Sequence, residues 1–159
     1  RRWFFPRYFV FRNGRGEQIG CAGTLWVLLN LDDRKMAPPG SVAATIPDNS
    51  DLTPPMGLPG TVDEVPGEER TLLRTPQYFD LDVNQHVNNT RYADWACDAL
   101  GVEVMRAYCL DTLRINFAAE VRPDQEITLR VSRDGLLYRV AGYREDRMHF
   151  EVGGTLRKR

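Results

Sequence analysis

The clearest pattern of apolar positions in this chain has the period of an α-helix. Apolar residues recur at spacings of three and four, which places them on one helix face: Tyr92, Trp95, Ala96, Ala99 and Leu100. Arg91, Asp94 and Asp98 fall on the other side. We therefore predict an amphipathic helix over residues 90–100, with one more turn at residues 102–107.

The ends of this helix are marked by residues that favour helix termini. Asn88 or Asn89 precedes it, and an asparagine side chain can accept a hydrogen bond from the free N–H groups of a first helical turn. Gly101 follows it, and glycine favours the position just after a helix because it tolerates positive φ.

Stretches rich in aromatic and β-branched residues predict strands on both sides of the helix. These stretches are residues 3–12, 17–30, 69–79, 110–121, 125–133, 136–144 and 147–157. Turn signals such as Asn13-Gly14 and Asp134-Gly135 separate several of them. An antiparallel sheet wrapped around the one long helix satisfies this order, because the apolar helix face must be covered. The predicted class is α+β in the hotdog arrangement, and the order alone leaves other α+β folds open.

Residues 37–68 differ from the rest in composition. Proline and glycine are frequent there, acidic residues outnumber basic ones, and large apolar residues are few. Such a segment cannot pack a core of its own, so we predict a linker at residues 47–68. The linker would divide the chain into a partial N-terminal domain, residues 1–46, and a complete C-terminal domain, residues 69–159.

Composition argues against several classes of function. The formal net charge is −1, so the sequence gives no support to a nucleic-acid partner, which usually requires a basic face. No apolar run approaches the ~18 residues that cross a bilayer, so we expect no membrane span. With two histidines and no metal-ligand spacing among the cysteines, we expect no metal site. The cysteines are predicted to be buried free thiols: Cys21, Cys97 and Cys109.

The candidate chemistry lies in the polar segment Asp80–Asn89, directly before the predicted helix. In an extended stretch Asp82, Asn84 and His86 would point to the same side, because side chains alternate along a strand. A histidine can move a proton near neutral pH, and a helix start offers N–H groups that can hold the oxygen of a polarised carbonyl. The residues alone also fit a plain capping turn with a satisfied histidine, so both interpretations stay open.

The same segment resembles the signature of the acyl-acyl carrier protein (acyl-ACP) thioesterase family of bacteria and plant plastids. The similar positions are Asp82, Asn84, His86, Val87, Asn88 and Asn89, followed by Tyr92 and Trp95. Residues 20–29 also resemble the end of the family's N-terminal hotdog. The resemblance implies a double-hotdog protein whose C-terminal hotdog is catalytic and complete here, whereas its N-terminal hotdog is partial.

This resemblance implies hydrolysis of fatty acyl-ACP thioesters to free fatty acid and holo-ACP, a step of fatty acid biosynthesis that ends chain elongation. The implied catalytic groups are Asp82, Asn84, His86 and Glu120, the last on the strand after the helix, 34 residues beyond the histidine. The implied substrate-binding positions are Val87, Asn88, Asn89, Tyr92 and Trp95. The resemblance implies no cofactor. The partner would be acyl carrier protein bearing its acyl chain on 4'-phosphopantetheine, in the cytoplasm of a bacterium or a plastid of a plant.

These residue types favour direct hydrolysis by water. Glu120 would deprotonate the water, Asn84 would position the water or the carbonyl, and His86 would protonate the departing thiolate. Asp82 would orient Asn84 or His86, and the base role could also belong to His86. Plant members of the family often carry a cysteine directly after the strand acid; Val121 stands there in this chain, which excludes a thiol nucleophile at that position.

Other interpretations of the same residues remain. The donor could be acyl-CoA, or the protein could be a non-catalytic acyl-binding hotdog. Glu120 could form a plain salt bridge with Arg114 or Arg122. We expect His149 to lie on the surface. Because an incomplete first hotdog leaves a sheet edge exposed, we also expect association into a homodimer.

Overall fold

Two compact units make up the chain. The structure, a computed structural model, describes residues 3–30, 32–33, 35–40, 45–46, 49 and 51–159. The units comprise residues 1–60 and residues 61–159. Among the described residues, no helix is both long and apolar enough to cross a membrane.

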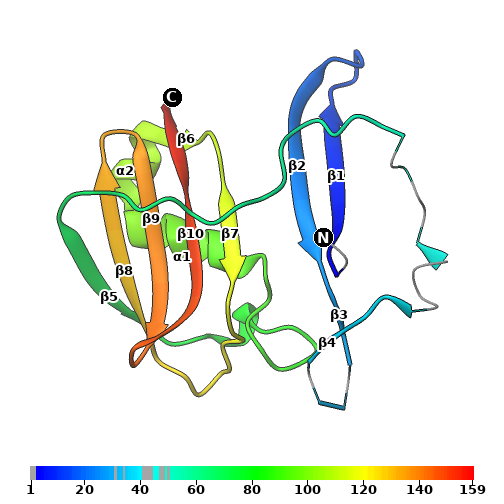
Figure 1. Cartoon of the computed structure of the whole chain (residues 1–159). Coiled ribbons are helices and arrows are strands. Elements are labelled where there is room, and N and C mark those ends of the chain that lie inside the picture. The colour runs from blue at the N-terminus through cyan, green and yellow to red at the C-terminus, as the bar shows by residue number, and fades with distance from the viewer. Residues whose placement is uncertain (1–2, 31, 34, 41–44, 47–48, 50) are drawn as a thin grey trace. The chain divides into compact units, whose positions relative to one another are not determined.

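The first unit is built on an antiparallel hairpin of β1 (Phe5–Arg12) and β2 (Gln18–Trp26) (Figure 1). Its turn is closed by the Asn13 side chain, whose Oδ1 accepts the N–H groups of Arg15 and Glu17. The strands predicted on either side of the Asn13-Gly14 turn signal are therefore confirmed, and they pair as a hairpin. The predicted second strand is split, because a separate short strand follows it. That strand, β3 (Leu28–Leu29), pairs with β4 (Met36–Ala37).

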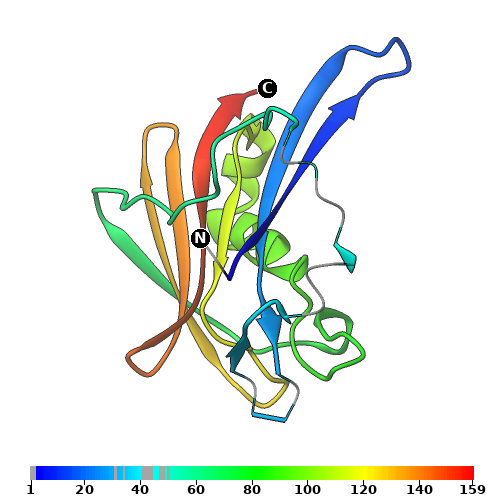
Figure 2. The same ribbon diagram turned by 45° about the vertical axis from the view of Figure 1, so that its right-hand side comes forward.

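The second unit is an antiparallel sheet that covers a helix pair. The sheet follows the order β5-β8-β9-β10-β6, and β7 also pairs with β10. The strands are β5 (Glu69–Arg74), β6 (Tyr108–Leu110), β7 (Arg114–Phe117), β8 (Ile127–Asp134), β9 (Leu137–Arg144) and β10 (Arg147–Lys158). The helices α1 (Arg91–Leu100) and α2 (Val102–Ala107) lie on one face of this sheet (Figures 1 and 2). The unit has the predicted hotdog arrangement.

The core lies between α1 and the sheet. The five apolar residues that predicted the helix face are all buried. They pack against sheet residues such as Phe150 and Val152 of β10, both fully buried. The aromatic rings of Tyr92 and Trp95 lie 4.4 and 6.0 Å from the ring of Phe150. Gly101 ends the helix with φ 95°, as predicted.

The predicted strand over residues 110–121 is wrong in its extent. Two short strands, β6 and β7, pair with successive parts of β10, and the chain leaves the sheet at Asp111–Leu113 and after Phe117. The first interruption is caused by the pairing with β10, because Asp111 and Thr112 both donate their N–H groups to the carbonyl of Thr155. Two N–H groups on one acceptor require an irregular ladder, which sequence composition does not reveal.

The acidic segment before β5 pairs with arginines of the sheet. Asp63 lies 3.5 Å from Arg114, and Glu64 lies 3.4 Å from Arg139. Residues 51–68 form no helix or strand in the structure. Within the predicted linker, residues 47, 48 and 50 lie outside the described residues. The acidic composition of its later part is thus explained by basic partners in the second unit.

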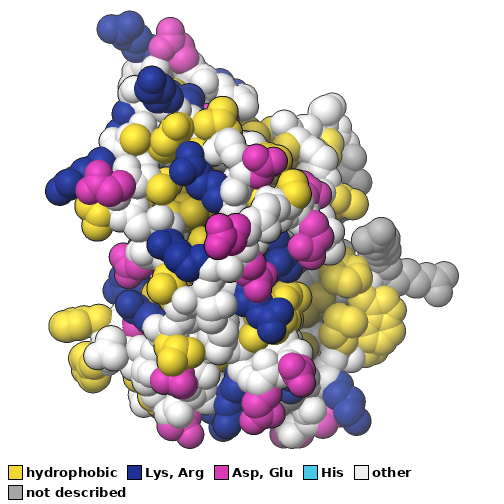
Figure 3. Space-filling view, turned by 90° about the vertical axis from the view of Figure 1, so that its left-hand side faces the viewer, with side chains coloured by type: hydrophobic (Ala, Val, Ile, Leu, Met, Phe, Trp, Pro, Cys, Tyr) yellow, Lys and Arg dark blue, Asp and Glu magenta, His cyan; other side chains and the backbone are white. Residues whose placement is uncertain are grey.

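Surface charge is mixed on the face seen in Figure 3. Lys and Arg side chains alternate there with Asp and Glu side chains, and no large area carries one sign. A field of single sign, as needed to steer a polyanion, is therefore not a feature of this face.

Gly142 of β9 provides a test of the core. A Cβ at this position would overlap the ring of Phe150, so we expect Gly142→Ala to destabilise the protein by about 1–3 kcal/mol through overpacking. Urea unfolding would show a lower midpoint with an unchanged slope. Gly14→Ala is the matched control, since none of the described residues lies within 4 Å of its new Cβ. Equal midpoints for the two variants would contradict this packing.

Candidate functional site

The polar segment before α1 forms a tight hairpin. Leu81 pairs with Val87 in an isolated antiparallel bridge, and the N–H of Asp82 donates to the carbonyl of His86 at 3.0 Å. Gln85 closes the turn with φ 61°, a left-handed conformation that non-glycine residues rarely adopt. The expected extended stretch is therefore wrong. Asp82 and His86 still face each other, because they lie on opposite arms of the hairpin.

A backbone hydrogen bond joins this hairpin to a distant part of the chain. The N–H of Val87 donates to the carbonyl of Val121 at 2.8 Å. Both valine side chains are buried in the core, at 1% and 0% exposure. Val87 directly follows His86, and Val121 directly follows Glu120. The pairing therefore brings His86 and Glu120 together although they are 34 residues apart in the sequence.

His86 lies between two carboxylates. Its Nδ1 is 3.4 Å from Asp82 Oδ2, and its Nε2 is 3.9 Å from Glu120 Oε1. The side chains of His86 and Asp82 are about one-fifth exposed, at 22% and 20%, whereas that of Glu120 is 47% exposed. An imidazole held by a carboxylate on one nitrogen can exchange a proton through the other. His86 and Glu120 therefore have the geometry of an acid–base pair that solvent can reach.

Asn84 enters the array through its backbone. Its N–H donates to Asp82 Oδ1 at 2.8 Å, which fixes the carboxylate that faces His86. The residue itself lies at the exposed tip of the hairpin. Its observed contribution is thus the orientation of Asp82, the reverse of the orientation of Asn84 by Asp82 that the sequence suggested.

Glu120 lies in a loop, which corrects the expectation that a strand carries it. The strand β7 ends at Phe117, and β8 begins only at Ile127. Arg114, one of its suggested salt-bridge partners, lies 3.5 Å from Asp63. The distance to His86 nevertheless agrees with the sequence prediction that these two groups share one site.

Tyr92 reaches the array from the core. Burial raises the pKa of its phenol to about 12. A hydrogen bond with the Val121 backbone acts in the opposite direction, and the negative charges of Glu120 and Asp82 add to the rise. The phenol therefore stays neutral at physiological pH, within the electrostatic influence of the two carboxylates.

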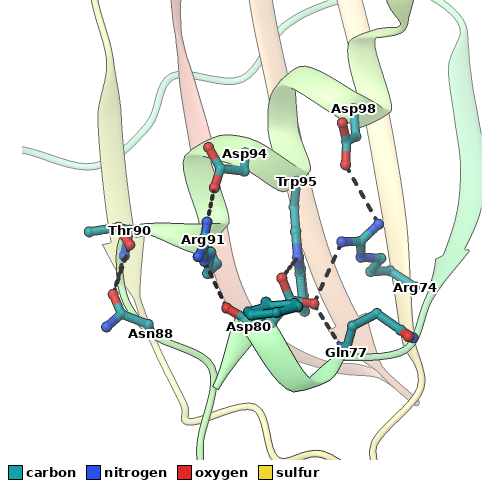
Figure 4. Close-up of polar contacts among 10 residues, drawn as sticks. Arg74, Gln77, Asp80, Asn88, Thr90, Arg91, Asp94, Trp95 and Asp98 are labelled. Atoms are coloured by element: carbon teal, nitrogen blue, oxygen red, sulfur yellow. Dashed lines mark hydrogen bonds and ion pairs between the residues drawn. The ribbon is translucent and has the colours of Figure 1, made fainter. Parts of the chain in front are cut away.

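A second polar network, which the sequence analysis missed, supports the hairpin from below. Asp80 is buried at 7% exposure, and its carboxylate accepts the indole N–H of Trp95 at 3.2 Å and the backbone N–H of Gln77 at 2.8 Å. Arg74 lies between Asp80 and Asp98 of α1, at 3.6 Å from each (Figure 4). The pattern Gln77-x-x-Asp80, a short helical capping box, was the available signal.

The start of α1 is organised by Asn88. Its Oδ1 accepts the N–H of Thr90 at 3.0 Å and the Thr90 hydroxyl at 2.8 Å, and its carbonyl accepts the N–H of Arg91 (Figure 4). The predicted capping by Asn88 or Asn89 is wrong, because the N-cap of α1 is Thr90, which makes no side-chain cap hydrogen bond. Asn88 orders the turn that precedes the helix instead. Asn89 is exposed, and none of the described residues accepts a hydrogen bond from its N–H. Trp95 is fully buried.

Two further predictions require correction. His149 is buried at 6% exposure, whereas we expected it on the surface. Its position on a β-bulge of β10 is the physical reason. All cysteines are free thiols, but Cys21 is exposed and the other two are only partly buried. Across the described part of the chain, no group of three or more His, Cys, Asp or Glu side chains could hold a metal ion.

Comparisons with known proteins point to one family. Residues 65–151 match the acyl-ACP thioesterase C-terminal domain. The chain is 28% identical over 124 residues to an oleoyl-acyl carrier protein thioesterase, chloroplastic, of Coriandrum sativum, covering 70% of this chain and 33% of that protein. It is 31% identical over 112 residues to a palmitoyl-acyl carrier protein thioesterase, chloroplastic, of Cuphea hookeriana. That match covers 66% of this chain and 27% of that protein. The chain thus spans a third or less of the length of these relatives.

Solved structures share the fold along nearly the whole chain. An acyl-ACP thioesterase from Bacteroides thetaiotaomicron superposes with a TM-score of 0.82 at 23% identity, covering 99% of this chain and 64% of that one. The 12:0-ACP thioesterase from Umbellularia californica gives a TM-score of 0.75 at 19% identity with the same coverage. Both units of the chain therefore have counterparts in known hotdog proteins.

The buried carboxylate of Asp80 yields a stability prediction. Asp80→Ala would leave the Trp95 indole and the Gln77 N–H without their acceptor, so we expect a loss of about 2–4 kcal/mol. Asp94→Ala is the control, because Asp94 is 61% exposed and its pair with Arg91 is expected to contribute less than about 1 kcal/mol. Chemical unfolding of both variants measures the difference, and equal losses would contradict a supporting role for Asp80.

The raised pKa of Tyr92 yields a prediction about alkaline pH. The Tyr92 phenol ionises near pH 10 in the unfolded chain and near pH 12 in the folded protein. The contribution of this group to folding stability is therefore fully present below pH 10 and is lost as pH rises toward 12. The tyrosinate absorbance lost in Tyr92→Phe should therefore appear near pH 12. A phenol that ionises near pH 10 in the folded protein would contradict its burial beside Glu120 and Asp82.

Proposed function

The chain belongs to the acyl-ACP thioesterase family, and from that premise we propose that the protein hydrolyses acyl-ACP thioesters to free fatty acid and holo-ACP. The observation that carries the proposal is the imidazole of His86 between the carboxylates of Asp82 and Glu120. A module that only binds acyl chains has no need of a solvent-accessible acid, base and orienting carboxylate in one place. The array therefore favours catalysis over binding.

The proposed reaction is a direct attack by water on the thioester carbonyl. Glu120 takes a proton from the water as its oxygen bonds to the carbonyl carbon, and a tetrahedral oxyanion forms. When that oxyanion collapses, the carbon–sulfur bond breaks, Glu120 passes the proton it took from water to His86 Nε2, and His86 delivers this proton to the departing pantetheine thiolate. The half-exposed carboxylate of Glu120 suits the base role because water can reach it, whereas Asp82 is held by the Asn84 N–H and orients the imidazole.

The oxyanion requires hydrogen-bond donors that the fold leaves unused. The N–H groups of Val87 and Asn88 are engaged by Val121 and Asp80, and those of Thr90 and Arg91 are engaged by Asn88. The N–H of Asn89 has no acceptor within the described residues and lies in the turn that starts α1. We assign the backbone N–H of Asn89 as the donor to the thioester oxygen.

Roles are also proposed for the rest of the chain. Residues 69–159 are the catalytic hotdog, residues 1–46 are part of an N-terminal hotdog, and residues 47–68 link them. The neutral phenol of Tyr92 and the buried Val87 lie on the core side of the reacting groups, and we propose that they shape the substrate site from that side. The proposed partner is acyl carrier protein, which the names of the relatives also contain, with the acyl chain on its 4'-phosphopantetheine arm. A homodimer is proposed as the assembly.

Substitution of the two proton-transfer groups tests the proposal. We expect Glu120→Gln and His86→Ala each to lower kcat by about 10²–10⁴-fold, because proton transfer in the transition state is lost. Glu103→Gln is the matched control, since Glu103 is 87% exposed on α2 and pairs only with Arg106 among the described residues. The release of thiol from acyl-ACP and from acyl-CoA is measured side by side.

The outcomes separate the candidate functions. Faster cleavage of acyl-ACP supports the proposal, and faster cleavage of acyl-CoA assigns the protein to the acyl-CoA thioesterases instead. Binding of acyl-ACP without cleavage of either donor would indicate a non-catalytic acyl-binding protein. Near-normal kcat in both Glu120→Gln and His86→Ala would remove the assigned mechanism.

A further inference from the structure

His149 occupies a β-bulge directly behind the loop that carries Glu120. In the pairing of β9 with β10, Met148 lies opposite Tyr143 and Phe150 lies opposite Gly142, so His149 is the extra residue. A bulge redirects a side chain out of the regular alternation of a strand, and bulges are frequent beside active sites. Here it turns the imidazole into the protein, where only 6% of the residue remains exposed.

Three consecutive residues of the loop are attached to this one residue. The N–H groups of Ala118 and Ala119 donate to the carbonyl of His149 at 2.8 and 2.9 Å. The His149 Nδ1 lies 2.9 Å from the backbone carbonyl oxygen of Glu120. A carbonyl oxygen only accepts hydrogen bonds, so Nδ1 carries the proton and donates it. The next residue, Val121, is held by Val87, so the backbone of Glu120 is fixed from both sides.

We propose that His149 is a positioning residue that sets how far the Glu120 carboxylate reaches toward His86. The inference rests on the proposed role of Glu120 in hydrolysis. Glu120 lies in the loop between β7 and β8 with its side chain half exposed, so the hydrogen bonds to this loop set the position of its backbone. The side-chain hydrogen bond from His149 is made to the carbonyl of Glu120 itself, whereas the two hydrogen bonds to the His149 carbonyl come from the residues before it, Ala118 and Ala119. Small displacements of a catalytic group lower the reaction rate, so we expect the hydrogen bond from His149 to affect kcat.

Two substitutions separate the hydrogen bond from the bulk of the side chain. His149→Asn retains an N–H donor close to the position of Nδ1, and His149→Leu fills similar space without a donor. We expect His149→Leu to lower kcat for acyl-ACP by about 10–100-fold with a KM changed less than about threefold. His149→Asn should restore most of kcat. Equal losses in the two variants would overturn the proposal.

A double-substitution cycle tests whether His149 acts through Glu120. In the Glu120→Gln background, His149→Leu should lower the residual kcat by less than about threefold, because no base remains to be positioned. A general loss of folded structure would lower kcat by the same factor in both backgrounds. Equal factors would therefore overturn the proposal and leave His149 with a structural role only.

Nuclear magnetic resonance of the unsubstituted protein keeps the test independent of folding and of activity. The imidazole ¹⁵N shifts of His149 should show Nδ1 protonated and Nε2 bare. The opposite tautomer would overturn the proposal even if His149→Leu failed to fold. If the unsubstituted protein cleaved neither thioester while Nδ1 was protonated as expected, the proposed function would fail and the kinetic role of His149 with it. An active protein with the opposite tautomer would overturn only the role of His149.

Discussion

The hydrogen bond from the Val87 N–H to the Val121 carbonyl is the constraint on which the site depends. It joins the hairpin before α1 to the loop after β7, and each valine is buried beside a functional residue. Because both valines are anchored in the core, His86 and Glu120 are directed to the same side of the bond. The apolar neighbours thus fix the geometry, and the polar side chains remain accessible to water.

The surroundings of this bond explain why a polar site can rest on an apolar core. Tyr92 and Trp95 pack on Phe150 and form a rigid aromatic layer under the hairpin. Asp80 attaches the hairpin to that layer through the Trp95 indole. Both networks lie on the core side of the hairpin, and the imidazole and carboxylates lie on its solvent side. Acid–base chemistry requires that the reacting groups be held by a packed core on one side and be accessible to water on the other.

The sequence predicted the elements with strong periodicity better than the contacts between distant ones. The helix over residues 90–100 and its buried face were predicted correctly, since a 3.6-residue period is a local property. The break in the strand over residues 110–121 depends on Thr155, far along the chain, and could not be inferred locally. The burial of His149 depends on a one-residue bulge in strand pairing, which composition does not encode. His86 and Glu120 were paired by resemblance to a family, because no rule of spacing joins a hairpin to a loop 34 residues away.

The central claim is that the array of Asp82, His86 and Glu120 activates water rather than forming a covalent acyl intermediate. A single turnover in ¹⁸O-labelled water, with enzyme in excess over acyl-ACP, tests it most directly. Direct attack predicts that the fatty acid released in the first turnover carries one solvent oxygen and that the protein carries none. Label in the Glu120 carboxylate, with an unlabelled first product, would show that Glu120 is a nucleophile and would contradict the account.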